Sequence, residues 1–498
     1  MRGVFTTVRF LRNEIFKNVT AAAYDQWTKE QIEQIPFDLI EDGQPKYRDS
    51  VEREREIIRA RIKLAMNMEL GTRFDAEFIE EDLETLRNKT VSRDLVTVIP
   101  QACEACPEKS FFVTNACHGC LAHPCVEVCP VKAVSMQNGQ SFIDQEKCIK
   151  CGKCYDVCPY GSIVKNERPC VAACGVNAFI KDDQNRAVIV PEKCVGCGMC
   201  MVSCPFGAIM DKSEIVQVVE ALKGPNDVCA IIAPAFVGQF GDKVSPEQVV
   251  EGLLLLGFDD VREVAYGADI TAVDEARHFL KHVPLDQPFL ATSCCPAWLK
   301  VAQKELGDKA YCVSDSSSPM VETANFLRRS FPTTKIVMIG PCSAKKLEAA
   351  YMDAHGNVDY VLTFEEVNAM FVARGIELHT LTPSRKLDHA SVDGRGFAVS
   401  GGVLGAVENV IRRIDPDRVV KVERAENLHN CRKMLLLAKA GKRDGYLLEG
   451  MACPGGCVGG AGTIVHQNRS AANVSTFARS SEKASALKTY DEFKNHPK

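Results

Sequence analysis

The stretch "CIKCGKCYDVCP", residues 148–159, spaces four cysteines as C-x2-C-x2-C-x3-C and ends on a proline. The same spacing returns in "CVGCGMCMVSCP", residues 194–205. Three closely spaced thiolates can wrap one face of a cubane iron–sulfur cluster, and the cysteine before the proline serves a neighbouring cluster. A zinc site would use two CxxC pairs without the third cysteine and the proline. The two stretches therefore predict 4Fe–4S clusters.

Cysteine usage in the whole chain supports metal binding. Sixteen of the 24 cysteines lie between Cys103 and Cys204 in a chain of 498 residues. A disulfide scaffold is normally short and carries a secretion signal. The first residues, "MRGVFTTVRFLRNEIF", are interrupted by charges and lack the apolar core of such a signal. We therefore expect metal-ligating cysteines in a cytoplasmic protein.

Composition argues against two classes of partner. The net charge is −5, and no run of Lys or Arg marks a nucleic-acid surface. The longest apolar stretches, such as residues 250–258, are far too short to span a bilayer. We expect neither nucleic-acid nor membrane binding.

An internal repeat organises the cysteine-rich segment. Residues 124–163 are echoed by residues 169–209, with a period of about 45 residues. Each unit resembles a two-cluster ferredoxin module. The resemblance implies three ligand sets, namely Cys117, Cys120 and Cys125 with Cys158; Cys148, Cys151 and Cys154 with Cys129; and Cys194, Cys197 and Cys200 with Cys174.

A fourth cluster is assigned to the cysteines that remain. Cys170 and Cys204 need two further cysteines to make a set of four cluster ligands. The pair Cys103 and Cys106 completes that set. This pair is remote from Cys170 in sequence, so a zinc site or a free CxxC stays an alternative. His118 and His123 stand among these ligands, but the cysteine count is complete without them. Four accessory clusters in a row would form a path for electrons.

The carboxyl-terminal half alternates short apolar runs with helix-like segments. Strands are predicted at 228–235, 261–266, 288–295, 334–342 and 445–454, and helices between them at 245–256, 274–283 and 365–375. This alternation predicts parallel sheet with helices on both faces. Ligands in such folds gather outside the carboxyl ends of the strands.

Three segments that follow predicted strands carry the remaining chemistry. They are "TSCCPAW" (292–298), "GPCSAKKLE" (340–348) and "EGMACPGGCVGGAG" (449–462). Together they resemble the signature of the iron-only (FeFe) hydrogenases: TSCCPxW, MPCxxKxxE and ExMACxxGCxxGGG. The resemblance covers about residues 225–475, is most like the group B branch, and includes "APAFVGQFG" (233–241) as the loop over the active site.

This resemblance implies an H-cluster, a 4Fe–4S cubane joined to a two-iron subsite with carbonyl, cyanide and dithiolate ligands. By position, the cubane ligands are Cys295, Cys342, Cys453 and Cys457, and Cys457 also bridges to the two-iron subsite. Lys345 matches a residue that hydrogen-bonds a cyanide, a charge-assisted contact. The residues expected to surround the cofactor are Ala233, Pro234, Ala235, Gly340, Lys345 and Met451. Glycines 455, 456, 459 and 460 are expected to let the backbone approach it.

The resemblance also implies a proton relay. Cys294 matches the thiol that exchanges protons with the two-iron subsite, and a thiol pKa of about 8.5 suits that role. Glu275 and Ser314 match the next two members. His278 stands where a second glutamate would be, and it carries protons near neutral pH or else faces another way. The exit of the relay is thus open.

Several positions depart from the family pattern. Gly340 replaces a methionine, Met320 replaces a glutamine, and "GGAG" at 459–462 replaces three glycines. We expect altered packing in the pocket. Of the cysteines outside all clusters, Cys229, Cys312 and Cys431 are interpreted as structural.

The expected organisation is an α/β and α+β multidomain protein. It comprises a helical region (1–100), a tandem ferredoxin-like domain (101–215), an H-cluster domain (225–475) and a tail (476–498). The expected activity is reversible interconversion of dihydrogen with protons and electrons. The implied partners are a ferredoxin-like electron carrier and cofactor maturation proteins. A hydrogen sensor and a hydrogenase-like iron–sulfur assembly protein are the alternatives; Cys294 argues against both, Lys345 against the second.

Overall fold

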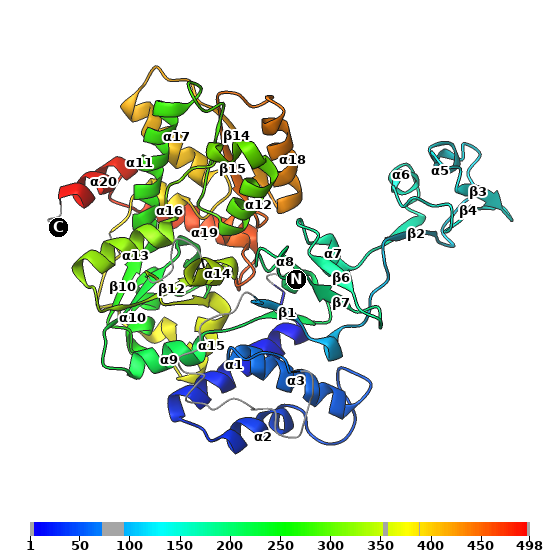
Figure 1. Ribbon diagram of the computed structural model, residues 1–498. Coiled ribbons are helices and arrows are strands. Elements are labelled where there is room, and N and C mark those ends of the chain that lie inside the picture. Colours follow the sequence, from blue (N-terminus) through cyan, green and yellow to red (C-terminus); the bar gives the residue numbers. More distant parts are fainter. Residues whose placement is uncertain (1–3, 72–93, 352–356, 388, 496–498) are drawn as a thin grey trace.

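The computed structural model describes residues 4–71, 94–351, 357–387 and 389–495. Three parts follow one another along the described chain (Figure 1): amino-terminal helices, a cysteine-bearing part of short hairpins, and a larger part of parallel sheets and helices. Among the helices of these ranges, none combines the length and the apolar character that a bilayer span requires.

The amino-terminal part consists of α1 (Thr7–Asp25), α2 (Lys29–Leu39) and α3 (Val51–Ala65). The helices begin after Thr6, Thr28 and Ser50, whose side chains accept hydrogen bonds from backbone N–H groups of the first turn. These helices contact both of the other parts of the chain. Helix α3 contacts β8 (Ile209–Asp211), but α1 packs on α9 (Ile215–Lys223) and α15 (Phe364–Ala373) of the carboxyl-terminal part.

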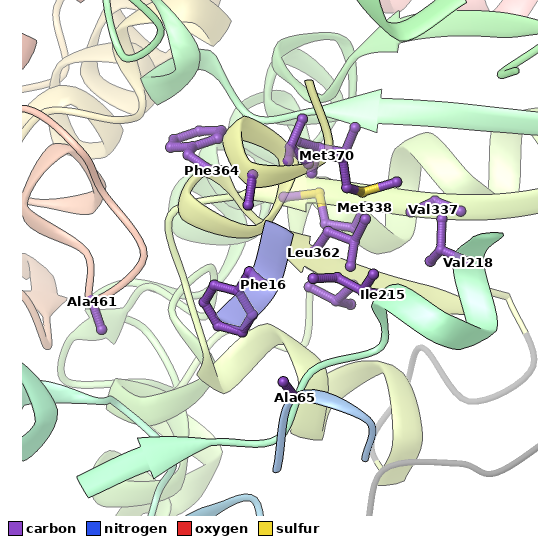
Figure 2. Close-up of a cluster of buried hydrophobic side chains, with 14 of the residues drawn as sticks. Phe16, Ala65, Ile215, Val218, Val337, Met338, Leu362, Phe364, Met370 and Ala461 are labelled. Carbon is purple, nitrogen blue, oxygen red and sulfur yellow. The ribbon is translucent and has the colours of Figure 1, made fainter. Parts of the chain in front are cut away.

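A shared hydrophobic core explains this second contact. Figure 2 shows Phe16 of α1 and Ala65 of α3 in one buried cluster with Ile215, Met338 and Phe364. Phe16 and Ala65 are almost fully buried there. Burying a phenylalanine side chain contributes about 1.5–3 kcal/mol. The amino-terminal helices are therefore part of the packing that surrounds β12 (Lys335–Gly340), the strand that carries Met338.

The cysteine-bearing part is built from antiparallel strand pairs. Within residues 94–211 these are β1 (Val96–Val98) with β8, β2 (Ser110–Val113) with β5 (Ile163–Asn166), β3 (Val134–Gln137) with β4 (Gln140–Ile143), and β6 (Phe179–Lys181) with β7 (Ala187–Ile189). The short helices are α5 (Pro124–Glu127), α6 (Lys153–Asp156), α7 (Pro169–Ala172) and α8 (Met199–Ser203). Two short helices and a hairpin thus occur in each half of the repeat.

The two halves of the repeat differ in where they lie. The half with α5 and α6 projects away from the rest of the molecule (Figure 1). The half with α7 and α8 lies against the carboxyl-terminal part, where a Cβ on Gly198 would stand 2.5 Å from the Cβ of Ala461. A glycine is needed at this position because the two parts approach so closely.

The carboxyl-terminal part contains two parallel sheets. The four-stranded sheet has the order β10 (Asp260–Glu263), β9 (Val228–Ile232), β12 (Lys335–Gly340), β13 (Tyr360–Thr363), and the three-stranded sheet has the order β11 (Leu290–Ala291), β15 (Tyr446–Met451), β14 (Lys421–Glu426). The main helices are α9, α10 (Pro246–Leu255), α11 (Val264–His282), α12 (Pro296–Leu306), α13 (Pro319–Ser330), α14 (Ala344–Tyr351), α15, α16 (Val392–Gly396), α17 (Gly402–Ile414), α18 (Leu428–Lys439), α19 (Gln467–Arg479) and α20 (Ala486–Asn495). The predicted parallel α/β architecture is confirmed.

Two predicted strands are wrong in extent. The run 261–266 leaves the sheet at Glu263, and Val264 already begins α11. The run 288–295 pairs with its neighbour only at Leu290 and Ala291. Short apolar runs fit a buried helix turn as well as a strand, so their composition could not decide.

Candidate active site

Loops from four parallel strands meet at one cavity. β9 leads into Ala233 and Pro234, β12 into Pro341 and Cys342, and the loops after β11 and β15 bring in the other cysteines. The cavity has a volume of about 90 Å³. Of the residues expected in the site, its walls include Ala233, Pro234, Cys294, Cys295, Cys342, Lys345, Met451, Cys453 and Cys457. Segments far apart in sequence are thus brought together as the resemblance implies.

Two residues expected beside the cofactor are not in the walls. Ala235, within the loop 233–241, is fully buried but does not line the cavity. Gly340 is covered by Met338, since a Cβ on Gly340 would lie 2.8 Å from the Cε of Met338. Met338 itself lines the cavity, as does Met320. The methionine missing at 340 is therefore replaced in space by a thioether from the same strand, which the sequence pattern did not reveal.

The glycines of the last motif also have a role in packing the protein backbone, and their expected approach to the cofactor stays a prediction. Gly456 and Gly460 line the cavity, but a Cβ on Gly456 would meet the backbone N of Ser400 at 2.6 Å. A Cβ on Gly460 would meet the carbonyl oxygen of Pro341 at 2.3 Å. These glycines allow protein backbones to pack together behind the cavity wall.

Lys345 is held in a fixed position at the cavity wall. Its Nζ donates to Ser318 Oγ at 2.9 Å and to the carbonyl oxygen of Cys294 at 3.3 Å, and it pairs with Glu348 Oε2 at 2.6 Å. Burial disfavours its charge, but Glu348, followed by the thiols of Cys342 and Cys294, more than compensates, and the pKa of Lys345 is raised. The ammonium group is therefore present at neutral pH.

The thiols of the cavity favour a metal cluster over free cysteine. Burial raises the pKa of Cys342 to about 11 and the pKa of Cys457 to about 12. Such thiols stay protonated at neutral pH unless a cation stabilises the thiolate, as a bound iron does. Four thiols around an apolar cavity, with one ammonium group, are the donors that an anionic iron–sulfur cofactor requires. The residues present fit that group.

Glu275 lies behind Cys294. It is fully buried on α11, and its Oε1 accepts hydrogen bonds from the backbone N of Ser293 at 3.1 Å and from Ser293 Oγ at 3.4 Å. Burial raises the pKa of Glu275 to about 7, although Ser293 and the neighbouring hydroxyl of Ser314 favour the ionised form. Burial raises the pKa of Cys294, and the negative charge of Glu275 raises it further. Cys294, Glu275 and Ser314 are thus neighbours.

His278 stands three residues beyond Glu275 on the same helix. Its Nδ1 lies 3.3 Å from Asp315 Oδ1, and its Nε2 lies 2.9 Å from Gln287 Oε1. The side chain of Asp315 is 87% exposed. Asp315 follows Ser314 directly, so the imidazole contacts the residue next to the buried serine. Asp315 belongs to none of the sequence motifs, whereas Ser293 lies within "TSCCPAW" (292–298).

The cysteines of the fourth proposed cluster converge despite their separation in sequence. Cys103, Cys106, Cys170 and Cys204 line one small cavity together with Arg168. The pKa of Cys170 is raised to about 11 by burial first and then by the other three thiolates. No three His, Cys, Asp or Glu side chains of the described ranges converge closely enough for a single metal ion.

The other cysteine sets are grouped as follows. Cys194, Cys197, Cys200 and Cys174 influence one another's charge. In the projecting unit, Cys117 and Cys125 both contact Ser141, and Cys154 lies close to Cys148 and Cys151. Cys129 and Cys158 pack on the hydrophobic core of that unit. In the projecting unit, these contacts connect Cys117 with Cys125 in one ligand set, and Cys154 with Cys148 and Cys151 in the other.

One residue joins the cluster-bearing part to the candidate active site. Cys197 belongs to the set with Cys174 and also lines the central cavity. Cys120, His118 and His123 do not line the central cavity. The His118 ring packs on Tyr160, with ring centroids 4.5 Å apart.

Comparison with known proteins gives three domain matches. Residues 226–461 match the family of the iron only hydrogenase large subunit, C-terminal domain. Residues 109–159 match the 4Fe-4S dicluster domain, and residues 187–210 match the 4Fe-4S binding domain. The matched ranges contain the central cavity and most of the cysteines of the repeat.

The curated relatives of this chain include hydrogenases. The NADP-reducing hydrogenase subunit HndD of Solidesulfovibrio fructosivorans is 30% identical over 64% of this chain and 56% of its own length. Iron hydrogenase 1 of Clostridium pasteurianum is 27% identical over 64% of each chain. Protein NAR1 of Arabidopsis thaliana is 24% identical over 51% of this chain and 69% of its own. The chain spans about three fifths of the two hydrogenases.

Proposed function

The chain belongs to the iron-only (FeFe) hydrogenase family, and we propose that it interconverts dihydrogen with protons and electrons at an H-cluster. The observation that carries the proposal is the single cavity shared by four cysteine thiols, the thiol of Cys294 and the ammonium group of Lys345. An assembly protein that holds only a cubane has no use for the last two groups. Membership of the group B branch stays a prediction.

The residues that would hold the cofactor follow from their places in the cavity. Cys295, Cys342, Cys453 and Cys457 would ligate the cubane, and Cys457 would be shared with the two-iron subsite. The bound cofactor supplies the metal chemistry that splits or forms the H–H bond. Lys345, fixed by Ser318 and Glu348, would donate a charge-assisted hydrogen bond to its anionic ligands. Met338 and Met320 exclude water from the remaining wall.

Proton movement would run through this chain's own side chains. Cys294 would hold the proton at Sγ beside the cofactor, and Glu275 would exchange it at its carboxylate. A pKa of about 7 places the carboxyl near the optimum for proton exchange at neutral pH. Ser314 and His278 would then lead toward the exposed Asp315. This proposal assigns His278 to the exit of the relay.

Electrons would travel along the accessory clusters. The thiol of Cys197 stands in the wall of the central cavity, so its cluster would be the one that exchanges electrons with the active site. The projecting unit would exchange electrons with a soluble carrier, for which we propose a ferredoxin-like protein. Loading of the two-iron subsite would require maturation proteins.

Infrared spectroscopy of the protein matured with its cofactor tests the proposal. We expect carbonyl and cyanide bands together with hydrogen turnover. Bands without turnover would favour a sensor. Their absence from a fully matured sample would favour an iron–sulfur assembly protein, the alternative to which the similarity to Protein NAR1 also draws attention.

Iron content tests the number of clusters. We expect about 22 iron atoms per chain, of which about 16 belong to four accessory cubanes. Replacing Cys170 by serine should remove about four of them without zinc taking their place. A parent protein with about 18 irons and one zinc would instead mean that Cys103 and Cys106 bind zinc.

A further inference from the structure

Arginines from α3 and from the loop before it donate to backbone carbonyls near Cys103 and Cys204 in the walls of the cavity lined by Cys103, Cys106, Cys170 and Cys204. Arg61 of α3 is 2% exposed, and its Nη2 donates to the carbonyl oxygen of Gly207 at 3.0 Å. Gly207 lies three residues after Cys204 in the same loop. A Cβ on Gly207 would lie 2.8 Å from Nη2 of Arg61, so the loop rests directly on the guanidinium group.

Two further arginines hold both sides of this cavity. Arg48 donates to the carbonyl oxygen of Phe206 at 2.9 Å, and Arg53 donates to the carbonyl oxygen of Gln101 at 2.9 Å. Both also lie near Glu104, at 3.7 Å from Arg48 and 2.9 Å from Arg53. The charge of Glu104, between Cys103 and Cys106, is thereby balanced.

Arg61 differs from these two because its charge is buried and has no paired carboxylate among the described residues. Its Nη1 makes no hydrogen bond there. Burial and then Arg12 and Arg48 lower the pKa of Arg61 to about 10, while the Cys204 thiolate acts in the opposite direction. The group is therefore still a cation at neutral pH, and its contact with Gly207 places it against the loop that carries Cys204.

We propose that Arg61 raises the reduction potential of the cluster held by Cys103, Cys106, Cys170 and Cys204, so that the amino-terminal helices act on the electron path. The inference rests on the proposed function, because it requires a cluster at these cysteines. Reduction adds a negative charge to the cluster, and a nearby buried cation stabilises the added charge. Screening by solvent is small because Arg61 is enclosed.

The test compares variants of the full chain with all accessory clusters reconstituted. Arg61→Gln keeps a donor for the Gly207 carbonyl and removes the charge, and Arg61→Lys keeps the charge. Arg55→Gln is the matched control, because Arg55 is also buried on α3 but donates to Ile40 and pairs with Asp42. Cys170→Ser identifies the couple that belongs to this cluster. Each protein is titrated with reductant and followed by electron paramagnetic resonance.

We expect Arg61→Gln to keep its iron while the ratio of reduced to oxidised cluster at a fixed potential falls about tenfold, which is about 59 mV for one electron. Arg61→Lys and Arg55→Gln should stay near the parent. An unchanged midpoint in Arg61→Gln overturns the inference, as does loss of about four irons, which would mean a purely structural role. If Cys170→Ser keeps the parent's iron content and titration, the cluster assignment itself fails instead.

Discussion

Cys294→Ala is expected to leave the active-site cofactor assembled and to abolish hydrogen turnover. The side chain lies in the cavity wall but is not among the four proposed ligands, so its removal leaves their contacts unchanged. The site would then lack a proton carrier within hydrogen-bond reach, and we expect a loss of at least about a hundredfold. Infrared spectra should still show carbonyl and cyanide bands. Turnover and spectra are measured on the same matured sample.

The neighbouring residue and a remote thiol provide the controls. Cys295→Ala removes a proposed cubane ligand, so iron and the infrared bands should be lost together with turnover. Cys312→Ala removes another fully buried thiol that lies outside the cavity, and it should leave both readouts unchanged. Cys294→Asp should recover part of the rate, since a carboxylate also exchanges protons. Near-parental turnover of Cys294→Ala would contradict the proton role and support a sensor.

The cysteine pattern predicted much of the site because metal ligation is local chemistry. CxxCxxC spacing and the three strand-end motifs fix which residues can surround a cluster, wherever the chain goes between them. The convergence of Cys103 and Cys106 with Cys170 could be proposed by counting cysteines. Its geometry depends on α3 and on the pairing of β1 with β8, neither of which the motifs specify.

Features that depend on tertiary packing could not be predicted from the sequence. Met338 lies in a strand that is buried almost throughout, and only its contact with Gly340 shows that it replaces the missing methionine. Strand β14 is largely polar and therefore lacked a strand pattern, although β15 pairs with it along its length. The partnership of His278 with Asp315 depends on how α11 meets the loop after Ser314. These contacts are set by element packing.

Glu275→Gln is expected to preserve every cluster and to lower turnover by about a hundredfold to ten-thousandfold. An amide has nearly the shape of the carboxyl group and can keep the contacts to Ser293, but it cannot pass a proton at neutral pH. His278→Ala should lower turnover less, because the exposed Asp315 and water remain near the exit. Turnover is measured with artificial electron carriers, so that the electron path is not limiting.

The same substitution has a pH-dependent effect on stability whose sign follows from burial. The pKa of Glu275 is about 7 in the folded protein against 4.5 for the free group. Its contribution to stability is therefore complete below about pH 4.5 and is lost as the pH rises through about 7, where the folded chain must hold a buried anion. Glu275→Gln has no such titration, so its melting temperature relative to the parent should rise between pH 5 and pH 8. If the melting temperatures of the two proteins instead changed with pH in the same way over this range, Glu275 would titrate outside it. The relay would then need a different second member.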